Sequence, residues 1–180
     1  MIVSETERLI IRHFQLSDAD YMLRQLNEDS FIRFIVDRQI RDLKGTEDYL
    51  ANGPMLSYQK HGFGLNAVVL KAENKPIGMC GLVKRDELSF PDLGYALLPE
   101  YWRQGYTYEA CVGVLEAAKE LQHSDRIMGV TLPDNQASNG LLRRLGFSQV
   151  GELDLYGHNN NLYELWLGPV HTNLTAPVAP

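Results

Sequence analysis

The sequence predicts a single-domain protein of mixed α/β class, with helices covering both faces of a central sheet. The 180 residues are enough for one domain with a sizeable core. Their composition, 44% hydrophobic and 22% charged, is ordinary for a globular protein. Along the chain, β-prone apolar runs alternate with apolar residues at helical spacing. Their order is one strand, helices, three strands, a helix, a strand, a helix and a final hairpin, which is typical of a mixed sheet.

The first part of the chain is predicted to be mainly helical after one strand. Ser17 and Asp20 form a capping-box-like start to one helix, and Thr46 marks the start of another. The residues His61-Gly62-Phe63-Gly64 then break the helical pattern. The predicted elements are a strand over 8–14, a helix from Ser17 through Leu26, a helical or irregular stretch over 31–35 and a helix from Thr46 toward Tyr58.

After this break the chain is predicted to alternate between strands and helices. The stretch 127–132 is β-branched and apolar, as strands are. Gly146 stands where a helix-terminating glycine is expected. The predicted strands are 65–70, 77–83, 92–98 and 127–132, the predicted helices are 106–121 and 138–145, and a final hairpin joins 147–156 to 162–167 through a turn at 157–160.

We find neither a repeat nor an interdomain linker, so residues 1–168 are expected to form one domain. The tail 169–180 contains three prolines among small residues and is predicted to be flexible. No apolar run approaches the roughly 20 residues of a membrane span. The N-terminus also lacks the basic flank and apolar core of a secretory signal.

The two cysteines, Cys80 and Cys111, are far apart and match neither a disulfide framework nor a metal site. They are predicted to be reduced core thiols of a cytoplasmic protein. The net charge is −6, and the chain has no basic run of the kind that binds nucleic acid. An acidic surface favours a cationic partner such as an amine or a basic protein tail, or it simply keeps the protein in solution.

The most informative segment runs from Asp92 to Cys111. An apolar run stops at Pro99, a short loop with Arg103, Gln104 and Gly105 follows, and a helix pattern begins. A tight strand-to-helix turn directs several backbone N–H groups to one point beside the positive end of the helix dipole. Gly105 lets a ligand approach the backbone because it has no Cβ. The segment therefore predicts a phosphate or pyrophosphate site, and the alternative is an ordinary turn.

From residue 7 to residue 167, the chain resembles the GNAT superfamily of N-acetyltransferases. Within it, the chain is most similar to the RimJ/RimL type, which acetylates the N-termini of ribosomal proteins. The likeness implies a mostly antiparallel central sheet, acetyl-CoA as co-substrate and an amine acceptor that attacks the thioester directly. Three segments give this resemblance: residues 6–12, residues 93–95 with 99–106, and residues 135–138 with 145–147.

The resemblance also implies which residues bind the cofactor. The backbone of the strand end is expected to pair with the pantetheine arm, and Asn135 is expected to contact the cofactor or to form an Asx turn. Two departures from the family pattern occur in the phosphate loop, Trp102 at its start and Thr107 at its end. The implied cofactor-binding residues are Leu97, Leu98, Arg103, Gln104, Gly105, Tyr106, Thr107 and Asn135. Arg143 or Arg144 is a candidate for the 3′-phosphate, or both belong to a solvated helix face.

Two residues are candidates for catalysis. Many relatives use a tyrosine on the helix to protonate the leaving thiolate, but Leu142 stands at that position here. The resemblance implies that Ser138 serves instead, and its alternative role is that of a first-turn serine. Asp92 is the candidate general base, acting through a water, or it is an ordinary charge at a strand start. His13 and His61 are alternative bases by residue type only.

The sequence thus predicts an acetyl-CoA-dependent N-acetyltransferase of one domain, with neither metal nor nucleic acid among its ligands. The acceptor is left open among a protein N-terminus, a polyamine, an antibiotic and another small metabolite. A catalytically silent acyl-CoA-binding module is the second hypothesis, because the helix tyrosine is missing. A third is an α/β domain that binds a different phosphate ligand. A homodimer is expected only by likeness to the family.

Overall fold

The computed structural model of the protein describes residues 1–121 and 123–169. Its centre is a sheet of eight strands in the order β1-β2-β3-β4-β5-β6-β8-β7. All neighbouring strands are antiparallel except β5 and β6. The strands are β1 Ile2–Glu5, β2 Leu9–His13, β3 Leu65–Leu70, β4 Lys75–Val83, β5 Asp92–Leu97, β6 Arg126–Thr131, β7 Ser148–Leu155 and β8 His158–Trp166. The predicted mixed, mostly antiparallel sheet is confirmed.

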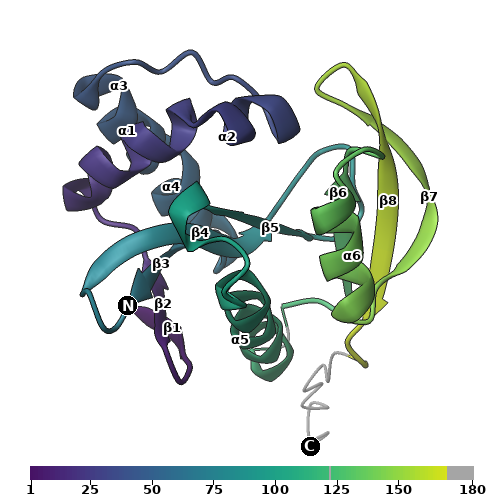
Figure 1. Ribbon diagram of the computed structural model, residues 1–180. Helices are drawn as coiled ribbons and strands as arrows, with labels where there is room; N and C mark the ends of the chain where they lie inside the picture. Colours follow the sequence, from purple (N-terminus) through teal and green to yellow (C-terminus); the bar gives the residue numbers. More distant parts are fainter. Residues whose placement is uncertain (122, 170–180) are drawn as a thin grey trace, which may run out of the picture.

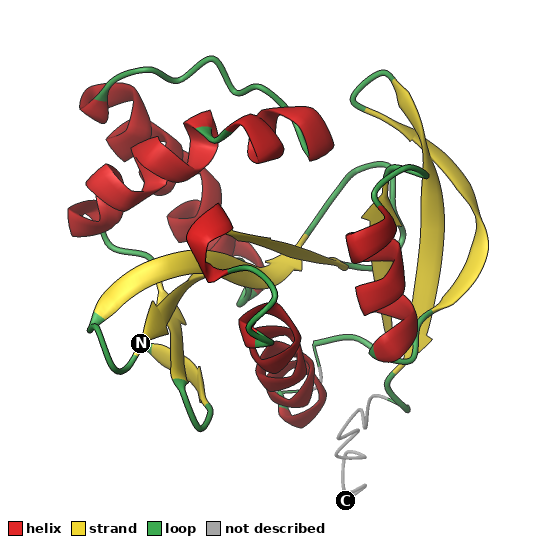
Figure 2. Cartoon of the chain, viewed as in Figure 1, coloured by secondary structure: helices red, strands yellow, loops and turns green. Residues whose placement is uncertain are grey.

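Helices cover both faces of this sheet (Figures 1 and 2). One apolar cluster joins α1, α2 and α3 to one face, through residues such as Met22, Leu26 and Leu50. The other joins α5 and α6 to the opposite face, through residues such as Val114 and Leu142. The helices are α1 Ala19–Asn27, α2 Asp29–Phe34, α3 Leu43–Leu50, α4 Leu56–His61, α5 Tyr106–Glu120 and α6 Gln136–Arg144.

Several predicted boundaries are corrected by local chemistry. The N-cap residue of α1 is Asp18 and not Ser17, and the Asp18 carboxylate closes the preceding 3-10 turn, Leu16–Asp18, by accepting from the Gln15 N–H at 2.9 Å while it pairs with Arg12. Helix α3 begins before Thr46, because Asp42 caps it by accepting from the N–H of Gly45. Pro54 lies in a π-helical turn, Ala51–Met55, that separates α3 from α4 where one helix was predicted.

Two strand predictions also change. The N-terminal strand β1 was not predicted, and it pairs with β2 at one edge of the sheet. The final hairpin turn is shorter than predicted, because Leu155 pairs directly with His158. Tyr156 and Gly157 form this turn, with φ of 53° and 77°, as a two-residue turn with positive φ at both positions requires. Strand β8 therefore begins four residues before its predicted start.

The remaining sequence-level expectations concern cysteines, membranes and the tail. Cys80 and Cys111 are free and buried, with their sulfur atoms 3.7 Å apart. Among the described residues, none of the helices has the length and apolar character needed to cross a membrane. Most of the predicted flexible tail, 170–180, lies outside the described residues.

Candidate active site

The sheet opens between β5 and β6. These parallel neighbours share a single register pair, Asp92 with Met128. The Leu98 N–H bonds to the Ile77 carbonyl of β4 at 2.9 Å. Because successive residues direct their peptide groups to opposite edges of a strand, Tyr95 and Leu97 direct theirs toward β6. Beyond Asp92 the β5 edge that faces β6 is thus a free edge, suited to a ligand that contains amides.

Of the two leucines that were expected to bind the pantetheine arm through their backbone, only Leu97 directs its peptide groups toward the opening. Leu98 has its N–H bonded to Ile77 and its carbonyl bonded to the N–H of Tyr101, so its backbone is not free to bind a ligand. Leu97 faces the opening, but its carbonyl accepts from the indole N–H of Trp102 at 2.8 Å. Trp102, which departs from the family pattern, thereby ties the loop to the strand end. Both leucine side chains are buried in the core.

The loop before α5 has the backbone geometry of an anion site. Arg103 and Gly105 have positive φ, 58° and 83°, and Gly105 is the N-cap of a helix of 15 residues. Within the described residues, no group accepts from the N–H of Gly105, Tyr106, Thr107 or Tyr108. These donors lie at the positive end of the α5 dipole, where phosphate groups bind. We call this loop, residues 103–108, the cradle.

Arg8 lies beside the cradle, which the sequence did not indicate. Its guanidinium donates to the carbonyl of Gln104 at 3.0 Å and lies 4.4 Å from the centre of the Tyr106 ring. A 2.6 Å ion pair with Glu109 in the first turn of α5 holds it there. Arg8 follows β1 in sequence, so it joins the first strands to the cradle and adds a positive charge next to it.

On the other side of the opening, α6 presents Ser138. Asn135 caps this helix, with its Oδ1 accepting from the Ser138 N–H at 3.2 Å, so its side chain serves the capping role. The Ser138 Oγ lies 2.6 Å from the hydroxyl of Tyr95 in β5. The two residues are 43 positions apart in sequence, and their hydrogen bond bridges the β5 side and the α6 side of the opening.

Tyr95 is the second residue that the sequence did not single out. Burial raises the pKa of its phenol far above the ordinary value, so the hydroxyl keeps its proton. A protonated Tyr95 and the Ser138 hydroxyl form a pair in which either oxygen can donate. Tyr95 belongs to the family-like segment 93–95, but its contact with Ser138 depends on the packing of α6.

Asp92 is buried at the start of β5 and faces the α3–α4 side of the sheet. Its Oδ1 accepts from the Nε of Arg85 at 2.8 Å, and its side chain is 3% exposed. Burial raises the pKa of this carboxyl, and the charge of Arg85 opposes the rise. The raised pKa suits Asp92 to act as a base, whereas its ion pair with Arg85 suits a role in positioning that arginine.

The helix position that carries a tyrosine in many relatives is occupied here by Leu142. Leu142 is 1% exposed in the core, so this position does not reach a ligand.

The two arginines that follow on α6 differ in their surroundings. Arg144 stacks over Tyr108 in the first turn of α5, at 4.1 Å from the ring centre, whereas Arg143 donates to Tyr163. Arg144 is therefore the better placed of the two for a phosphate. His13 stacks against Tyr58, at 3.7 Å between ring centres, away from Ser138.

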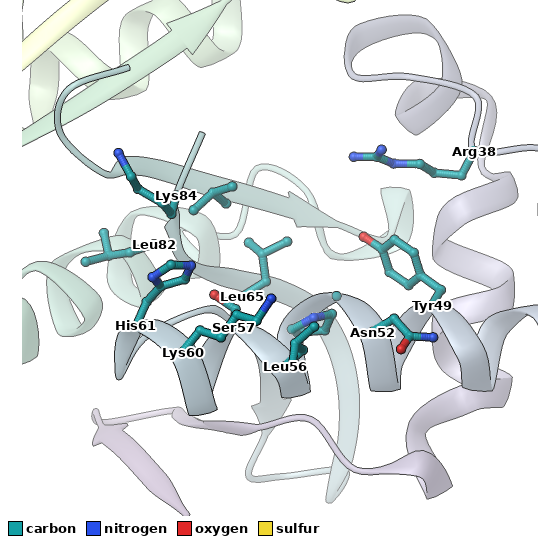
Figure 3. Close-up of a pocket in the computed structure, with 13 residues that line it drawn as sticks. Arg38, Tyr49, Asn52, Leu56, Ser57, Lys60, His61, Leu65, Leu82 and Lys84 are labelled. Atoms are coloured by element: carbon teal, nitrogen blue, oxygen red, sulfur yellow. The ribbon is translucent and has the colours of Figure 1, made fainter. Parts of the chain in front are cut away.

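A groove of about 320 Å³ lies between α3–α4 and the ends of β3 and β4 (Figure 3). Arg38 and Tyr49 lie at one end of it in the figure, and His61 and Lys84 lie at the other. The groove is close to β5, because Val83, which lines it, pairs with Asp92.

Residues 8–148 match the model of the acetyltransferase (GNAT) domain, which covers most of the chain. The chain belongs to the GNAT acetyltransferase family. It is an N-acetyltransferase that depends on acetyl-CoA, the usual co-substrate of GNAT enzymes. The free N–H groups of the cradle suit the phosphates of that molecule.

Two curated relatives show how far this GNAT enzyme resembles named proteins. An uncharacterized N-acetyltransferase of Bacillus subtilis, YoaA, is 27% identical over 180 residues, which cover 99% of this chain and 97% of YoaA. The ribosomal protein uS5-alanine N-acetyltransferase of Escherichia coli is 34% identical over 86 residues, which cover 47% of this chain and 42% of that enzyme.

Two solved structures have the same fold. RimL, a ribosomal L7/L12 α-N-protein acetyltransferase in complex with coenzyme A, superposes with a TM-score of 0.80 at 18% identity, covering 92% of this chain and 98% of RimL. The microcin C7 self-immunity acetyltransferase MccE, in complex with acetyl-CoA and AMP, gives 0.77 at 18% identity over 89% of this chain and 93% of MccE. At this identity the likeness concerns the fold alone.

Proposed function

We propose that this GNAT enzyme transfers the acetyl group of acetyl-CoA to a primary amine at the opening between β5 and β6. One observation supports this most directly: the cradle with its free N–H groups follows the end of β5, and the Tyr95–Ser138 pair joins β5 to α6 across the opening. A phosphate site at the strand end and a proton donor across the opening are what acetyl transfer from a thioester needs.

The donor would be held mainly by backbone. Gly105, Tyr106, Thr107 and Tyr108 offer N–H groups to the pyrophosphate, with Arg8 and Arg103 adding charge next to them. The free edge of β5 at Tyr95 and Leu97 would pair with the amide-containing arm. Bound there, acetyl-CoA supplies a thioester carbonyl that an amine can attack.

Ser138 and Tyr95 would supply the proton for the departing sulfur. If Tyr95 donates to the Ser138 Oγ, the serine proton is free to point into the opening. The high pKa of Tyr95 keeps its own proton in place, so Tyr95 orients the serine hydroxyl, and the proton that the serine gives to the departing thiolate is replaced by one from the nitrogen of the attacking amine. Asp92 is proposed to accept the proton that the ammonium form of the acceptor amine loses before attack. Its ion pair with Arg85 also suits a second role, in which Asp92 fixes the position of Arg85 on the acceptor side of the site.

The transfer is proposed to be direct, without an acyl-enzyme. Cys80 and Cys111 are both 0% exposed, and burial raises the pKa of the Cys111 thiol well above its ordinary value. Neither thiol is therefore suited to carry an acetyl group. Proximity of the two substrates would then account for most of the rate.

A protein N-terminus is the second candidate acceptor, and a ribosomal protein is the specific form of it. It is favoured by the resemblance to the RimJ/RimL type and by the partial match to the uS5-alanine enzyme. The match covers less than half of each chain, so we keep the broader statement, a primary amine, as the proposed function.

The experiment is thermal unfolding with and without acetyl-CoA, followed by thiol release with a panel of amines. Ligand at about 100 times its Kd adds about 2.7 kcal/mol of stability, or roughly 5–10 °C for a domain of this size. Desulfo-CoA and free phosphate serve as controls. Absence of a shift at millimolar acetyl-CoA would contradict the proposal, and a shift without turnover of any amine would support the silent module instead.

A further inference from the structure

The groove in Figure 3 is basic, although the protein as a whole is acidic. Its lining includes Arg38, Lys60 and Lys84 together with His61, and contains neither aspartate nor glutamate. The whole chain has 23 acidic and 17 basic residues and a net charge of −6. A cluster of cations without acids is therefore not what the overall composition predicts.

These cations also lack the partners that most basic residues of the chain have. Within residues 1–121 and 123–169, neither Arg38 nor Lys60 nor Lys84 forms an ion pair. Lys84 donates instead to the carbonyl of Leu88 at 3.0 Å. Other arginines and lysines of the chain are paired, such as Arg12 with Asp18 and Arg126 with Glu164. Cations without ion-pair partners along one groove suit an anionic ligand.

The hydroxyl of Tyr156 is a second feature that suits an anion. Arg38 and Arg85 donate to its oxygen, at 3.2 Å and 2.8 Å. None of the described groups accepts the proton of that hydroxyl. An oxygen that already accepts two hydrogen bonds directs its own O–H outward, toward an acceptor such as a carboxylate or phosphate oxygen.

The nearby acidic groups do not cancel this charge. Asp92 is buried and already paired with Arg85, which removes its net effect on the groove. Glu87 is exposed, close enough to Asp92 to affect its titration, and does not line the groove. Asp37, next to Arg38 in sequence, pairs with Arg41 and does not line the groove. The lining of the groove therefore keeps a positive balance.

The groove also lies next to the candidate base. Val83, which lines the groove, pairs with Asp92 across β4 and β5. A Cβ placed on Gly94 would lie 3.0 Å from Leu65 and 3.2 Å from Val83, so these two groove residues pack against the backbone of β5 at Gly94. The groove therefore adjoins the start of β5, the strand that borders the opening.

From these observations, and resting on the function proposed above, we infer that the acceptor is a small primary amine that also bears a carboxylate or a phosphate. Arg38 and the Tyr156 hydroxyl beside it bind the anionic group at one end of the groove, Lys84 at the other end adds to the positive charge of the lining, and the amine extends toward Asp92 at the start of β5. The volume of about 320 Å³ is at the small end of ligand pockets, which favours a small molecule over a peptide.

The test compares matched amines by thiol release at saturating acetyl-CoA. β-Alanine is compared with β-alaninamide, and phosphoethanolamine with ethanolamine, so that the two pairs distinguish a carboxylate from a phosphate. We expect kcat/KM to be at least about tenfold higher for the anionic member of one pair. The R38Q/K84Q double variant should remove this preference and leave the thermal shift with acetyl-CoA unchanged.

The control variant is Lys71→Gln. Lys71 follows the last residue of β3, whereas Leu65, which lines the groove, is the first residue of that strand. This variant also removes a positive charge, and it should keep the preference for the anionic amine. Equal or better turnover of the neutral members, or a preference that survives in R38Q/K84Q, would overturn the inference while leaving the proposed function intact. Turnover confined to peptides would overturn the assignment to a small molecule. If acetyl-CoA does not raise the Tm of the unmodified protein, the result would contradict the proposed function instead.

Discussion

Gly105 has a φ of 83°, a conformation that side chains with a Cβ rarely adopt. Gly105→Val is expected to cost about 1–2 kcal/mol in backbone strain and to disturb the N–H groups at the start of α5. The valine would also crowd Arg8, whose Nη2 lies 3.4 Å from the added Cβ. We therefore predict that the variant stays folded but loses the rise in Tm caused by acetyl-CoA, measured by thermal unfolding.

The matched control is Gly157→Val in the β7–β8 turn. Gly157 has a similar φ of 77°, and nothing lies within 4 Å of an added Cβ. This variant should show comparable strain and a normal acetyl-CoA shift. An unchanged shift in Gly105→Val would mean that the cradle does not bind the phosphates.

The Tyr95–Ser138 pair gives a second prediction at the scale of single residues. Tyr95→Phe and Ser138→Ala should each lower kcat roughly 10- to 100-fold, because each breaks the same proton path. The double variant should lose little more than either single one, since the two hydroxyls act as a unit. Stopped-flow or steady-state thiol release measures kcat, and thermal unfolding verifies that acetyl-CoA still binds.

Tyr163→Phe is the control for this prediction. Tyr163 is also a buried tyrosine whose hydroxyl donates to a side chain, Asn139, at 2.7 Å. Its loss should affect stability more than kcat. Fully additive losses in the Tyr95 and Ser138 variants would exclude a shared proton path.

At the scale of elements, Glu109 fastens the β1–β2 turn to the start of α5. Its carboxylate accepts from the Thr6 hydroxyl at 2.6 Å and from the Arg8 N–H at 2.9 Å, and it pairs with the Arg8 guanidinium. Burial raises the pKa of Glu109, but these hydrogen bonds outweigh it and leave the pKa below its ordinary value. The contact therefore stabilises the fold above the ordinary pKa of a glutamate and loses its effect as pH falls through the lowered one.

Glu109→Gln should accordingly lower the free energy of unfolding by about 2 kcal/mol near pH 7. The difference in Tm between the two proteins should begin to shrink as pH falls below about 4.5 and should disappear only below the lowered pKa of Glu109, where both proteins carry a neutral side chain. Thermal unfolding from pH 7 to pH 3 measures it. A difference in Tm that does not depend on pH would contradict the assigned ion pair.

The elements also show what the sequence could predict. Strand β3 and helix α5 have clear apolar periods, and both were predicted to within one residue. Strand β1 was missed because its four residues are half-exposed at a sheet edge and show little pattern. The cap at Asp18 rather than Ser17 was missed because it depends on an ion pair with Arg12 in a neighbouring strand.

At the scale of the whole molecule, the site is assembled from distant parts of the chain. The cradle lies within one continuous segment, so its strand-to-helix turn could be predicted from the local sequence, whereas its binding of phosphates stays a prediction. By contrast, Arg38 and Tyr156 are 118 residues apart, and their contact depends on a hairpin turn that the sequence placed differently. Net charge favoured a cationic partner such as an amine, but it averages over the whole surface and could not indicate a groove lined by cations.

This difference between the whole and the local charge gives the last prediction. Raising ionic strength from about 0.01 M to about 1 M shortens the Debye length from about 30 Å to about 3 Å. The net charge of −6 repels an acceptor of net negative charge such as phosphoethanolamine, so screening of that long-range field alone would lower its KM. Screening of Arg38 and Lys84 at the groove would raise it.

If the groove binds the anionic group, KM for phosphoethanolamine, which carries a net negative charge, should rise several-fold with salt at saturating acetyl-CoA. KM for ethanolamine, a cation that the net charge attracts, should depend on salt to the same extent in the unmodified protein and in R38Q/K84Q, because it has no anionic group for the groove to bind. In R38Q/K84Q only the repulsion by the net charge is left, so the salt dependence for the anionic acceptor should change sign. A fall in KM with salt in the unmodified protein would show that the overall charge governs acceptor binding.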